Sequence, residues 1–355
     1  MPFQRNPVLQ TTGSAHERVG TALVIQTAFL GDVVLTTPLL EALARRAGPV
    51  DVVTTPAALP LIETHPGVRR AIPYDKRGRD RGVAPFLALA RALRAERYEA
   101  AYLPHRSLRS AALAWLARIP RRVGFHDGWP LLYTEVRHRP AGGHESDRLL
   151  TLAGEPPHSI VPRLSATPAD EAAVDAWLGA AGGLAGGFVA LAPGSIWGTK
   201  RWPYYHDLAE RLARREGIVV VGGAEDAGLA SEITAAVGRS GGRAVSACGH
   251  LTLRQCAVLI ARARLLITND SAPLHLATAM GTPVVAVFGP TIPEFGFGPV
   301  RETDVSVGLV GLACRPCSDH GPPACPLGHH RCMRELSVDR VLAAIEETGA
   351  LRRRD

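Results

Sequence analysis

The segment 266–291, LITNDSAPLHLATAMGTPVVAVFGPT, restricts the fold more than any other part of the chain. The apolar runs 265–268 and 284–288 have the length and composition of buried strands. Between them, Asn269, Asp270 and Ser271 are typical residues for a helix start, while Gly281 and Pro283 are typical of a helix end. A strand, a helix and a strand in so short a segment predict a parallel crossover unit.

The predicted helix start also indicates a ligand. Asp270, Ser271 and His275 place a carboxylate, a hydroxyl and an imidazole there. The N-terminus of a helix attracts anions through its unpaired N–H groups and its dipole. A phosphate-bearing ligand therefore fits this position.

Apolar strands and amphipathic helices alternate along the rest of the chain, which predicts an α/β fold with parallel sheets. In the first half we expect strands at 22–27, 50–54, 70–73, 100–104 and 122–125, and helices at 33–46, 57–64, 83–97, 108–119 and 145–153. In the second half we expect strands at 188–192, 218–221, 244–247, 265–268, 284–287 and 305–310, and helices at 169–181, 204–215, 227–237, 253–262, 271–280 and 338–348.

The proline-rich segment 154–168 interrupts this alternation and predicts a linker. We therefore expect a flexible arm at 1–20, an N-terminal Rossmann-like domain at 21–160 and a C-terminal Rossmann-like domain at 161–355, with the ligand cleft between them. The first 20 residues lack the apolar region of a secretory signal, and no apolar run is long enough to span a bilayer.

A net charge of +7 is compatible with nucleic acid, anionic lipid or phosphorylated ligands. The chain shows no helix-turn-helix, zinc-finger or aromatic-rich strand signature, so we expect no nucleic-acid partner.

Three loops at predicted strand ends contain most of the polar chemistry. In the first, Asp32 follows Gly31 and is either a helix cap or a residue of the cleft. The second, 193–203, is glycine-rich with hydroxyls and cations, and it either wraps phosphates or is a solvated surface loop. In the third, Glu225 follows a Gly-Gly turn and either binds a ribose or favours the next helix start.

The segments GDVVLTTPLL (31–40), PGSIWGTKRWP (193–203) and NDSAPLHLATAMGTPVVAVFGPT (269–291) together resemble the bacterial lipopolysaccharide heptosyltransferases of glycosyltransferase family 9. The segment CRPCSDHGPPACPLGHHRCM (314–333) is similar to the heptosyltransferase II branch. The resemblance implies a GT-B fold, with the acceptor in the N-terminal domain and the nucleotide sugar in the C-terminal domain. It also implies transfer of heptose from ADP-heptose to the lipopolysaccharide inner core, with inversion at the anomeric carbon.

The resemblance implies a role for each polar residue. Asp32 matches the general base that removes the acceptor proton. Lys200 matches the lysine that stabilises the leaving pyrophosphate. Asp270 either orients its loop or partners Lys200 or a metal. The remaining donor-binding positions are Ser195 and Thr199 for phosphate oxygens, Ser271, Ala272 and His275 at the helix start, and Glu225 for the ribose. If Asp32 is only a cap, His105 is the next candidate base.

Four cysteines lie close together in the sequence. Cys314, Cys317, Cys325 and Cys332 have the spacing C-x2-C-x7-C-x6-C, which fits a structural zinc site, an iron–sulfur cluster or paired disulfides. We favour a structural role that fixes an irregular loop, because the chemistry that the resemblance implies needs no thiol and no cofactor. Dependence on Mg²⁺ stays open.

The resemblance further implies a lipid A–Kdo core acceptor, here heptosyl-Kdo2-lipid A, with Kdo2-lipid A as the heptosyltransferase I alternative. We therefore expect a cytoplasmic protein in peripheral contact with the inner membrane. A cluster of basic residues is either the membrane contact or a solvated loop; its members are Arg69, Arg70, Lys76, Arg77, Arg79 and Arg81. Two other functions also fit: a nucleotide-sugar epimerase of the same architecture and a non-catalytic nucleotide-sugar binding protein.

Overall fold

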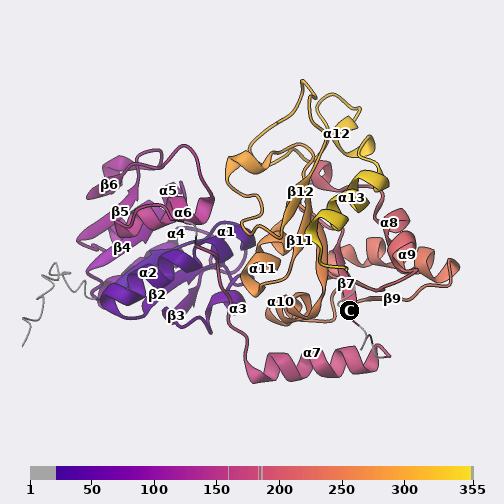
Figure 1. Cartoon of the computed structure of the whole chain (residues 1–355). Helices are drawn as coiled ribbons and strands as arrows, with labels where there is room; N and C mark the ends of the chain where they lie inside the picture. Colours follow the sequence, from indigo (N-terminus) through magenta and orange to yellow (C-terminus); the bar gives the residue numbers. More distant parts are fainter. Residues whose placement is uncertain (1–20, 159, 183, 185–186, 353–355) are drawn as a thin grey trace, which may run out of the picture.

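The computed structural model describes residues 21–158, 160–182, 184 and 187–352. Within these residues the chain forms two lobes, each built on a six-stranded sheet (Figure 1). Every strand pair is parallel. The predicted α/β class with parallel sheets is therefore confirmed. The predicted arm at 1–20 lies outside the described residues.

The N-terminal sheet has the order β3-β2-β1-β4-β5-β6. Its strands are β1 (Ala22–Ile25), β2 (Val50–Thr54), β3 (Val68–Pro73), β4 (Ala100–Leu103), β5 (Arg121–Phe125) and β6 (Glu135–Arg137). Its helices are α1 (Leu30–Leu35), α2 (Thr37–Ala47), α3 (Leu59–Ile62), α4 (Val83–Ala95), α5 (Leu108–Leu116) and α6 (Glu145–Leu150), with 3-10 turns η1 (Pro130–Leu132) and η2 (Thr151–Ala153).

The C-terminal sheet has the order β12-β11-β10-β7-β8-β9. Its strands are β7 (Phe188–Ala192), β8 (Gly217–Val220), β9 (Ala244–Ser246), β10 (Leu265–Asn269), β11 (Val284–Val287) and β12 (Val305–Val307). Its helices are α7 (Pro168–Ala180), α8 (Tyr205–Leu212), α9 (Ala227–Arg239), α10 (Leu253–Arg262), α11 (Ala272–Met280), α12 (Arg331–Arg334) and α13 (Val338–Thr348), with 3-10 turns η3 (Gly198–Lys200), η4 (Ala224–Asp226) and η5 (Pro293–Phe295).

The strands β1, β7 and β11 are apolar along their whole length because helices cover both faces of each sheet. In the N-terminal lobe α4 and α5 pack on one face and α1, α2, α3 and α6 on the other. In the C-terminal lobe α8, α9 and α13 pack on one face and α7, α10 and α11 on the other. The inner helices of both lobes share one hydrophobic cluster, so the lobes are packed against each other.

The helix predicted at 33–46 is two helices, α1 and α2, which meet at Thr36. Pro38 has no N–H to donate to the carbonyl of Val34, and the Thr37 hydroxyl donates to that carbonyl instead, at 2.8 Å. The helix α1 also begins earlier than predicted, at Leu30, so Gly31 and Asp32 lie in its first turn.

Candidate active site

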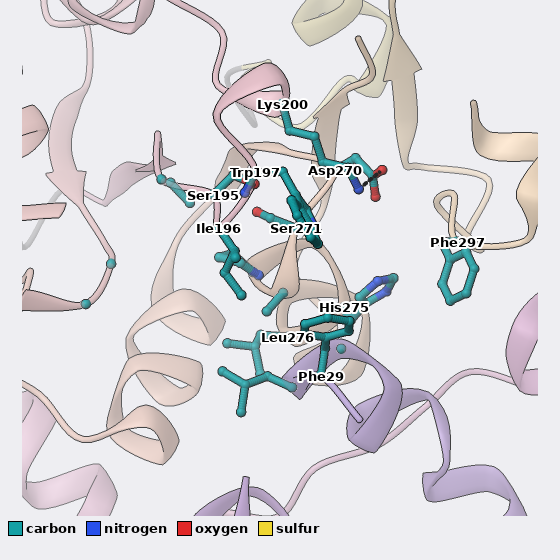
Figure 2. Close-up of a pocket in the computed structure, with 18 of the residues that line it drawn as sticks. Phe29, Ser195, Ile196, Trp197, Lys200, Asp270, Ser271, His275, Leu276 and Phe297 are labelled. Atoms are coloured by element: carbon teal, nitrogen blue, oxygen red, sulfur yellow. Dashed lines mark hydrogen bonds and ion pairs between the residues drawn. The ribbon is translucent and has the colours of Figure 1, made fainter. Parts of the chain in front are cut away.

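A cavity of about 430 Å³ lies between the lobes, at the carboxyl ends of β1, β7, β8, β10 and β11. The N-terminal lobe contributes the first turn of α1, and the C-terminal lobe contributes most of the remaining wall (Figure 2). Loops at the carboxyl ends of parallel strands are where α/β folds bind their ligands. The two lobes touch closely at this place. A Cβ atom on Gly31 would lie only 2.6 Å from Cδ2 of His275, so the glycine permits this approach.

Asn269 connects the segments that form the C-terminal wall of the cavity. Its side-chain oxygen accepts hydrogen bonds from the Trp202 backbone N–H and the Tyr205 hydroxyl, both at 3.2 Å. Its amide nitrogen donates to the Pro193 carbonyl at 2.8 Å. The loop 193–203 is therefore fixed to the start of α11. The sequence predicts only a helix-capping role for Asn269, because its structural role depends on contacts that sequence spacing does not reveal.

The start of α11 faces the cavity as predicted. Ser271 is the N-cap residue and Ala272 begins the helix, and both line the cavity with His275. The first N–H groups of a helix have no acceptor within it, so this end can bind an anion. Burial lowers the pKa of His275 to about 4, so the imidazole is neutral at pH 7 and can offer a hydrogen bond but no charge.

Lys200 and Asp270 form an ion pair in the cavity wall. Nζ of Lys200 lies 2.6 Å from Oδ2 of Asp270, and both side chains are nearly buried (Figure 2). The Thr291 hydroxyl donates to the same oxygen at 2.6 Å. Of the arrangements predicted for Asp270, the structure therefore contains the one in which it partners Lys200. Two hydrogen bonds hold this carboxylate, which fixes the lysine at the cavity.

The other two predicted phosphate ligands, Ser195 and Thr199, differ in whether they line the cavity. Ser195 lines the cavity, and its hydroxyl accepts the Trp197 N–H at 3.2 Å. Thr199 is buried outside the cavity lining, and its hydroxyl donates to the Pro322 carbonyl. The prediction that Thr199 faces the phosphates is therefore not matched by its position. The 3-10 turn η3 rotates Thr199 inward, a local geometry that the glycine-rich composition did not indicate.

Glu225 lines the cavity from η4, together with Asp226, which the sequence analysis did not select. Asp226 is buried, and its carboxylate accepts the Gly223 N–H at 3.2 Å. Burial raises the pKa of Asp226 above its usual value. Glu225 is the more exposed of the two carboxylates, so it is the better placed to meet ribose hydroxyls.

Asp32 lines the cavity from the opposite lobe. It is the third residue of α1 and not its N-cap residue, which is Phe29. Its Oδ2 accepts the Phe29 N–H at 3.0 Å. Burial raises the pKa of Asp32, while this hydrogen bond and the charge of Arg139 oppose the rise. The carboxylate thus combines a partial capping role with a position at the cavity, and the two predicted alternatives do not exclude each other.

His105, the alternative base, does not line the cavity. Its Nε2 lies 3.2 Å from the Ser110 hydroxyl and 3.5 Å from that of Thr27. Burial lowers its pKa to about 4. Because Asp32 lines the cavity and His105 does not, Asp32 is the better placed of the two to act as the general base.

Aromatic side chains complete the cavity wall. Trp197 lies beside Lys200 as an indole in the wall, whereas Trp202 is buried and donates to the Leu336 carbonyl at 2.9 Å. The other ring residues of the lining are Phe29, Phe295, Phe297 and His320. Phe295 ends η5 and Phe297 follows it, in the loop after β11, and a loop after a predicted strand is the signal that could identify them.

The four clustered cysteines are free thiols, like the other two cysteines. Cys332 is buried, and burial together with the neighbouring thiols raises its pKa to about 11. Among the residues that the structure describes, no group of three or more Cys, His, Asp or Glu side chains is arranged to hold a metal ion. Structural zinc therefore stays a prediction.

Zinc analysis of protein purified under reducing conditions tests this prediction. We expect bound zinc that is lost in Cys317→Ser and Cys325→Ser, with a lower melting temperature after chelation, because a structural site contributes folding energy. Cys256→Ser alters one of the two cysteines outside this cluster and should retain the metal. Metal-free protein whose melting temperature ignores chelators would remove the zinc hypothesis.

Two Rossmann-like lobes with a cavity between them are the architecture of a GT-B glycosyltransferase. The family model described as glycosyltransferase family 9 (heptosyltransferase) matches residues 86–326, which is more than half of the chain. The chain belongs to glycosyltransferase family 9.

Individual relatives agree with this membership. The chain is 29% identical to lipopolysaccharide heptosyltransferase 2 of Salmonella typhimurium over 77% of its own length and 84% of that protein. It is 28% identical to the Escherichia coli protein of the same name over 93% and 97% of the two chains. The solved structure of the E. coli ADP-heptose lps heptosyltransferase II covers 92% of this chain and 98% of that one, with a TM-score of 0.74 at 25% identity.

Proposed function

We propose that the protein transfers heptose from ADP-heptose to heptosyl-Kdo2-lipid A of the lipopolysaccharide inner core. The main support is one cavity in which Asp32 of the N-terminal lobe faces the α11 start and Lys200 of the C-terminal lobe. The names of the relatives at 28–29% identity point to the same reaction.

In this reaction the acceptor hydroxyl oxygen attacks the anomeric carbon of the donor as its bond to the phosphate oxygen breaks. The proton of that hydroxyl passes to the Asp32 carboxylate. The electron pair of the broken bond leaves with ADP. Negative charge thus develops on the pyrophosphate, where the Lys200 ammonium and the N–H groups of α11 stabilise it. Attack from the side opposite the leaving group inverts the anomeric centre.

The aromatic rings around the cavity have a role in this proposal as well. Phe29, Trp197 and Phe297 line the same cavity as Asp32 and Lys200 (Figure 2). Apolar walls exclude water, which would otherwise compete with the acceptor hydroxyl, and they strengthen electrostatic interactions inside the site. Donor transfer is thereby favoured over donor hydrolysis.

Incubation with ADP-heptose alone, with Kdo2-lipid A and with heptosyl-Kdo2-lipid A tests the proposal. We expect rapid ADP release only with heptosyl-Kdo2-lipid A. Faster transfer to Kdo2-lipid A would indicate the heptosyltransferase I activity. Conversion of the donor without an acceptor would indicate an epimerase, and donor binding without turnover would indicate a binding protein.

A lipid-linked acceptor also requires contact with a membrane surface. In the described part of the chain, no helix has the length and apolar character needed to cross a bilayer. Part of the predicted basic cluster binds other groups of the N-terminal lobe. Arg69 and Arg70 both bind the fully buried Asp51 at 2.8 Å, and Lys76 donates to the Thr27 carbonyl at 2.6 Å. All five arginines of the cluster are exposed, but the charges of Arg69 and Arg70 are paired with Asp51.

The surface around α5 offers a better membrane contact, and we name it the α5 face. Its exposed apolar residues are Val83, Leu108, Trp115, Trp129 and Leu131, and its exposed cations are Arg77, Arg81, Arg106, Arg109 and Arg118. These residues lie on or beside α4, α5 and η1, and α5 contacts both other elements. Tryptophan and arginine together favour the interface of an anionic bilayer.

We expect Leu131→Asp, which alters a fully exposed leucine of the α5 face, to weaken binding to vesicles that contain anionic lipid. Sedimentation with the vesicles measures the bound fraction, which should also fall as salt screens the arginines. Val310→Asp alters a valine of the C-terminal lobe that is 86% exposed and serves as the matched control. Equal binding of wild type and Leu131→Asp, or binding insensitive to salt, would contradict this orientation.

A further inference from the structure

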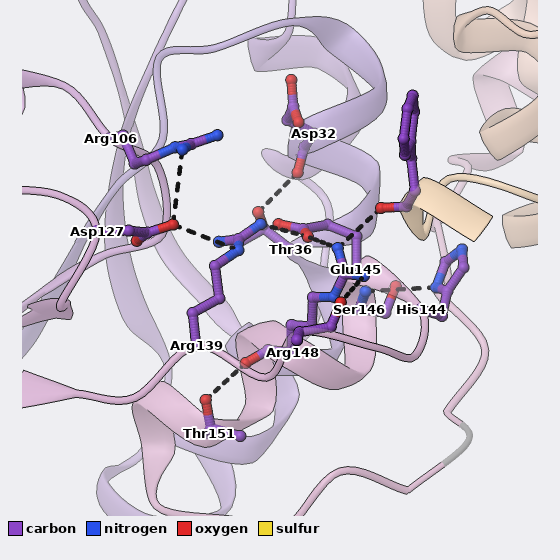
Figure 3. Close-up of polar contacts among 12 residues, drawn as sticks. Asp32, Thr36, Arg106, Asp127, Arg139, His144, Glu145, Ser146, Arg148 and Thr151 are labelled. Atoms are coloured by element: carbon purple, nitrogen blue, oxygen red, sulfur yellow. Dashed lines mark hydrogen bonds and ion pairs between the residues drawn. The ribbon is translucent and has the colours of Figure 1, made fainter. Parts of the chain in front are cut away.

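Arg139 and Glu145 form an ion pair beside Asp32 in the N-terminal lobe (Figure 3). The Arg139 guanidinium lies 2.5 Å from Oε2 of Glu145 and 4.0 Å from Oδ2 of Asp127. The Glu145 side chain is 6% exposed and that of Arg139 is 17% exposed. A guanidinium between two carboxylates and shielded from solvent has little freedom to move. The transfer proposed above uses neither residue.

Contacts from the C-terminal lobe also hold this pair. Glu145 is the first residue of α6, and its backbone N–H donates to the Gly296 carbonyl at 2.8 Å. The Arg148 guanidinium, 3.6 Å from Glu145, donates to the Phe295 carbonyl at 2.8 Å. Phe295 lines the cavity. The lobe that binds the nucleotide sugar therefore fixes the position of Glu145 directly.

The charge of Arg139 acts on both carboxylates. The Arg139 cation lowers the pKa of Asp32 against the rise that burial causes. Burial raises the pKa of Glu145 as well, and the neighbouring Asp32 adds to that rise while Arg139 opposes it. The two carboxylates are thus near enough to repel each other, and one arginine serves both.

The other ionisable groups around α1 do not supply the positive charge that Arg139 places near Asp32. His144 and His275 are neutral at pH 7, because burial lowers the pKa of each to about 4. The helix α3 has no ionisable side chain. The ionisable residues of α2 have partners elsewhere, Glu41 with His65 and both Arg45 and Arg46 with Glu155. Arg106 lies beyond Asp127, at 3.7 Å from that carboxylate.

We propose that Arg139 and Glu145 are positioning residues that together set how readily Asp32 takes up the acceptor proton. The proposal rests on the function proposed above. Without Arg139, no cation of the pair offsets the negative charges of Asp32 and Glu145, and Asp32 binds a proton more tightly. Without the charge of Glu145, Arg139 acts on Asp32 alone, and Asp32 binds a proton less tightly. The contacts to Gly296 and Phe295 come from the C-terminal lobe. The effect of the pair on Asp32 therefore depends on how the two lobes pack against each other.

Two substitutions with opposite expected effects test the pair. Arg139→Met should move the acidic limb of the kcat–pH profile to higher pH. Glu145→Gln keeps a hydrogen-bond acceptor for Arg139 and should move the same limb to lower pH. Arg139→Lys retains the charge and should stay close to wild type. Arg137→Met, two residues earlier and paired with Glu135, is the matched control and should leave the limb in place.

Carbon-13 titration of aspartate-labelled protein measures the Asp32 carboxyl without any turnover, with the signal identified by its loss in Asp32→Asn. The titration of Asp32 should move in the same opposite directions in Arg139→Met and Glu145→Gln. Unchanged titration in both folded variants, or displacement in one common direction, would overturn the proposal. Wild-type protein that fails to transfer heptose would refute the proposed function instead, while the carboxyl titration would still decide the role of the pair.

Discussion

Asp32→Asn is expected to lower kcat by about 10²–10⁴, the usual contribution of a positioned general base. The amide retains an oxygen that can accept the Phe29 N–H, which the carboxylate now accepts at 3.0 Å, so α1 should stay folded. Donor affinity should change little, because the nucleotide-sugar site lies in the other lobe. Steady-state kinetics, ADP-heptose titration and a melting curve on this variant measure the three quantities.

Asp207→Asn is a matched control, because Asp207 also lies in the first turn of a helix but is exposed and distant from the cavity. It should behave as wild type in all three measurements. Near-normal kcat in Asp32→Asn with a small loss of stability would show that Asp32 is only a structural residue of α1. The search for the base would then return to the other polar residues near the cleft, beginning with His105.

Lys200→Ala is expected to weaken ADP binding and to slow turnover together, since the ammonium meets the pyrophosphate both before and during its departure. The lost charge-assisted hydrogen bond is worth roughly 1.5–3 kcal/mol. The variant also leaves Asp270 without its ion-pair partner, with a negative charge next to the phosphates. Repulsion from that carboxylate should increase the loss of affinity.

The double variant Lys200→Ala/Asp270→Asn separates these two effects. It removes the unpaired charge, so calorimetry should show tighter ADP binding than in Lys200→Ala, though weaker than in wild type. Wild-type ADP affinity in Lys200→Ala would exclude Lys200 from the donor site. Equal affinities in the single and double variants would mean that Asp270 does not sense the phosphates.

The sequence predicted the central strands well because their signal is local. The strands β2, β7 and β11 have the bounds predicted for them, since helices bury both faces of their mostly apolar sequences. The strand β6 was missed for the opposite reason. It is a three-residue edge strand with the sequence EVR, too short and too polar to give an apolar run.

The site was predicted from motifs, and the structure places most of those residues around one cavity. Asp32, Lys200 and His275 come from different strand ends, yet all line it, because parallel strands bring their carboxyl ends to one edge. Thr199 was misplaced because the direction of a side chain in a 3-10 turn depends on its tertiary neighbours. Arg139 and Glu145 could not be selected, since their significance arises from contacts between distant segments.

Analysis of the product formed by the wild-type enzyme from ADP-heptose and heptosyl-Kdo2-lipid A decides whether the proposed direct displacement takes place. Mass spectrometry should show the addition of one heptose, and NMR of the anomeric centre should show a single product with the configuration opposite to that of the donor. An unmodified acceptor would contradict heptosyl transfer. A product with retained configuration would contradict a single displacement assisted by Asp32.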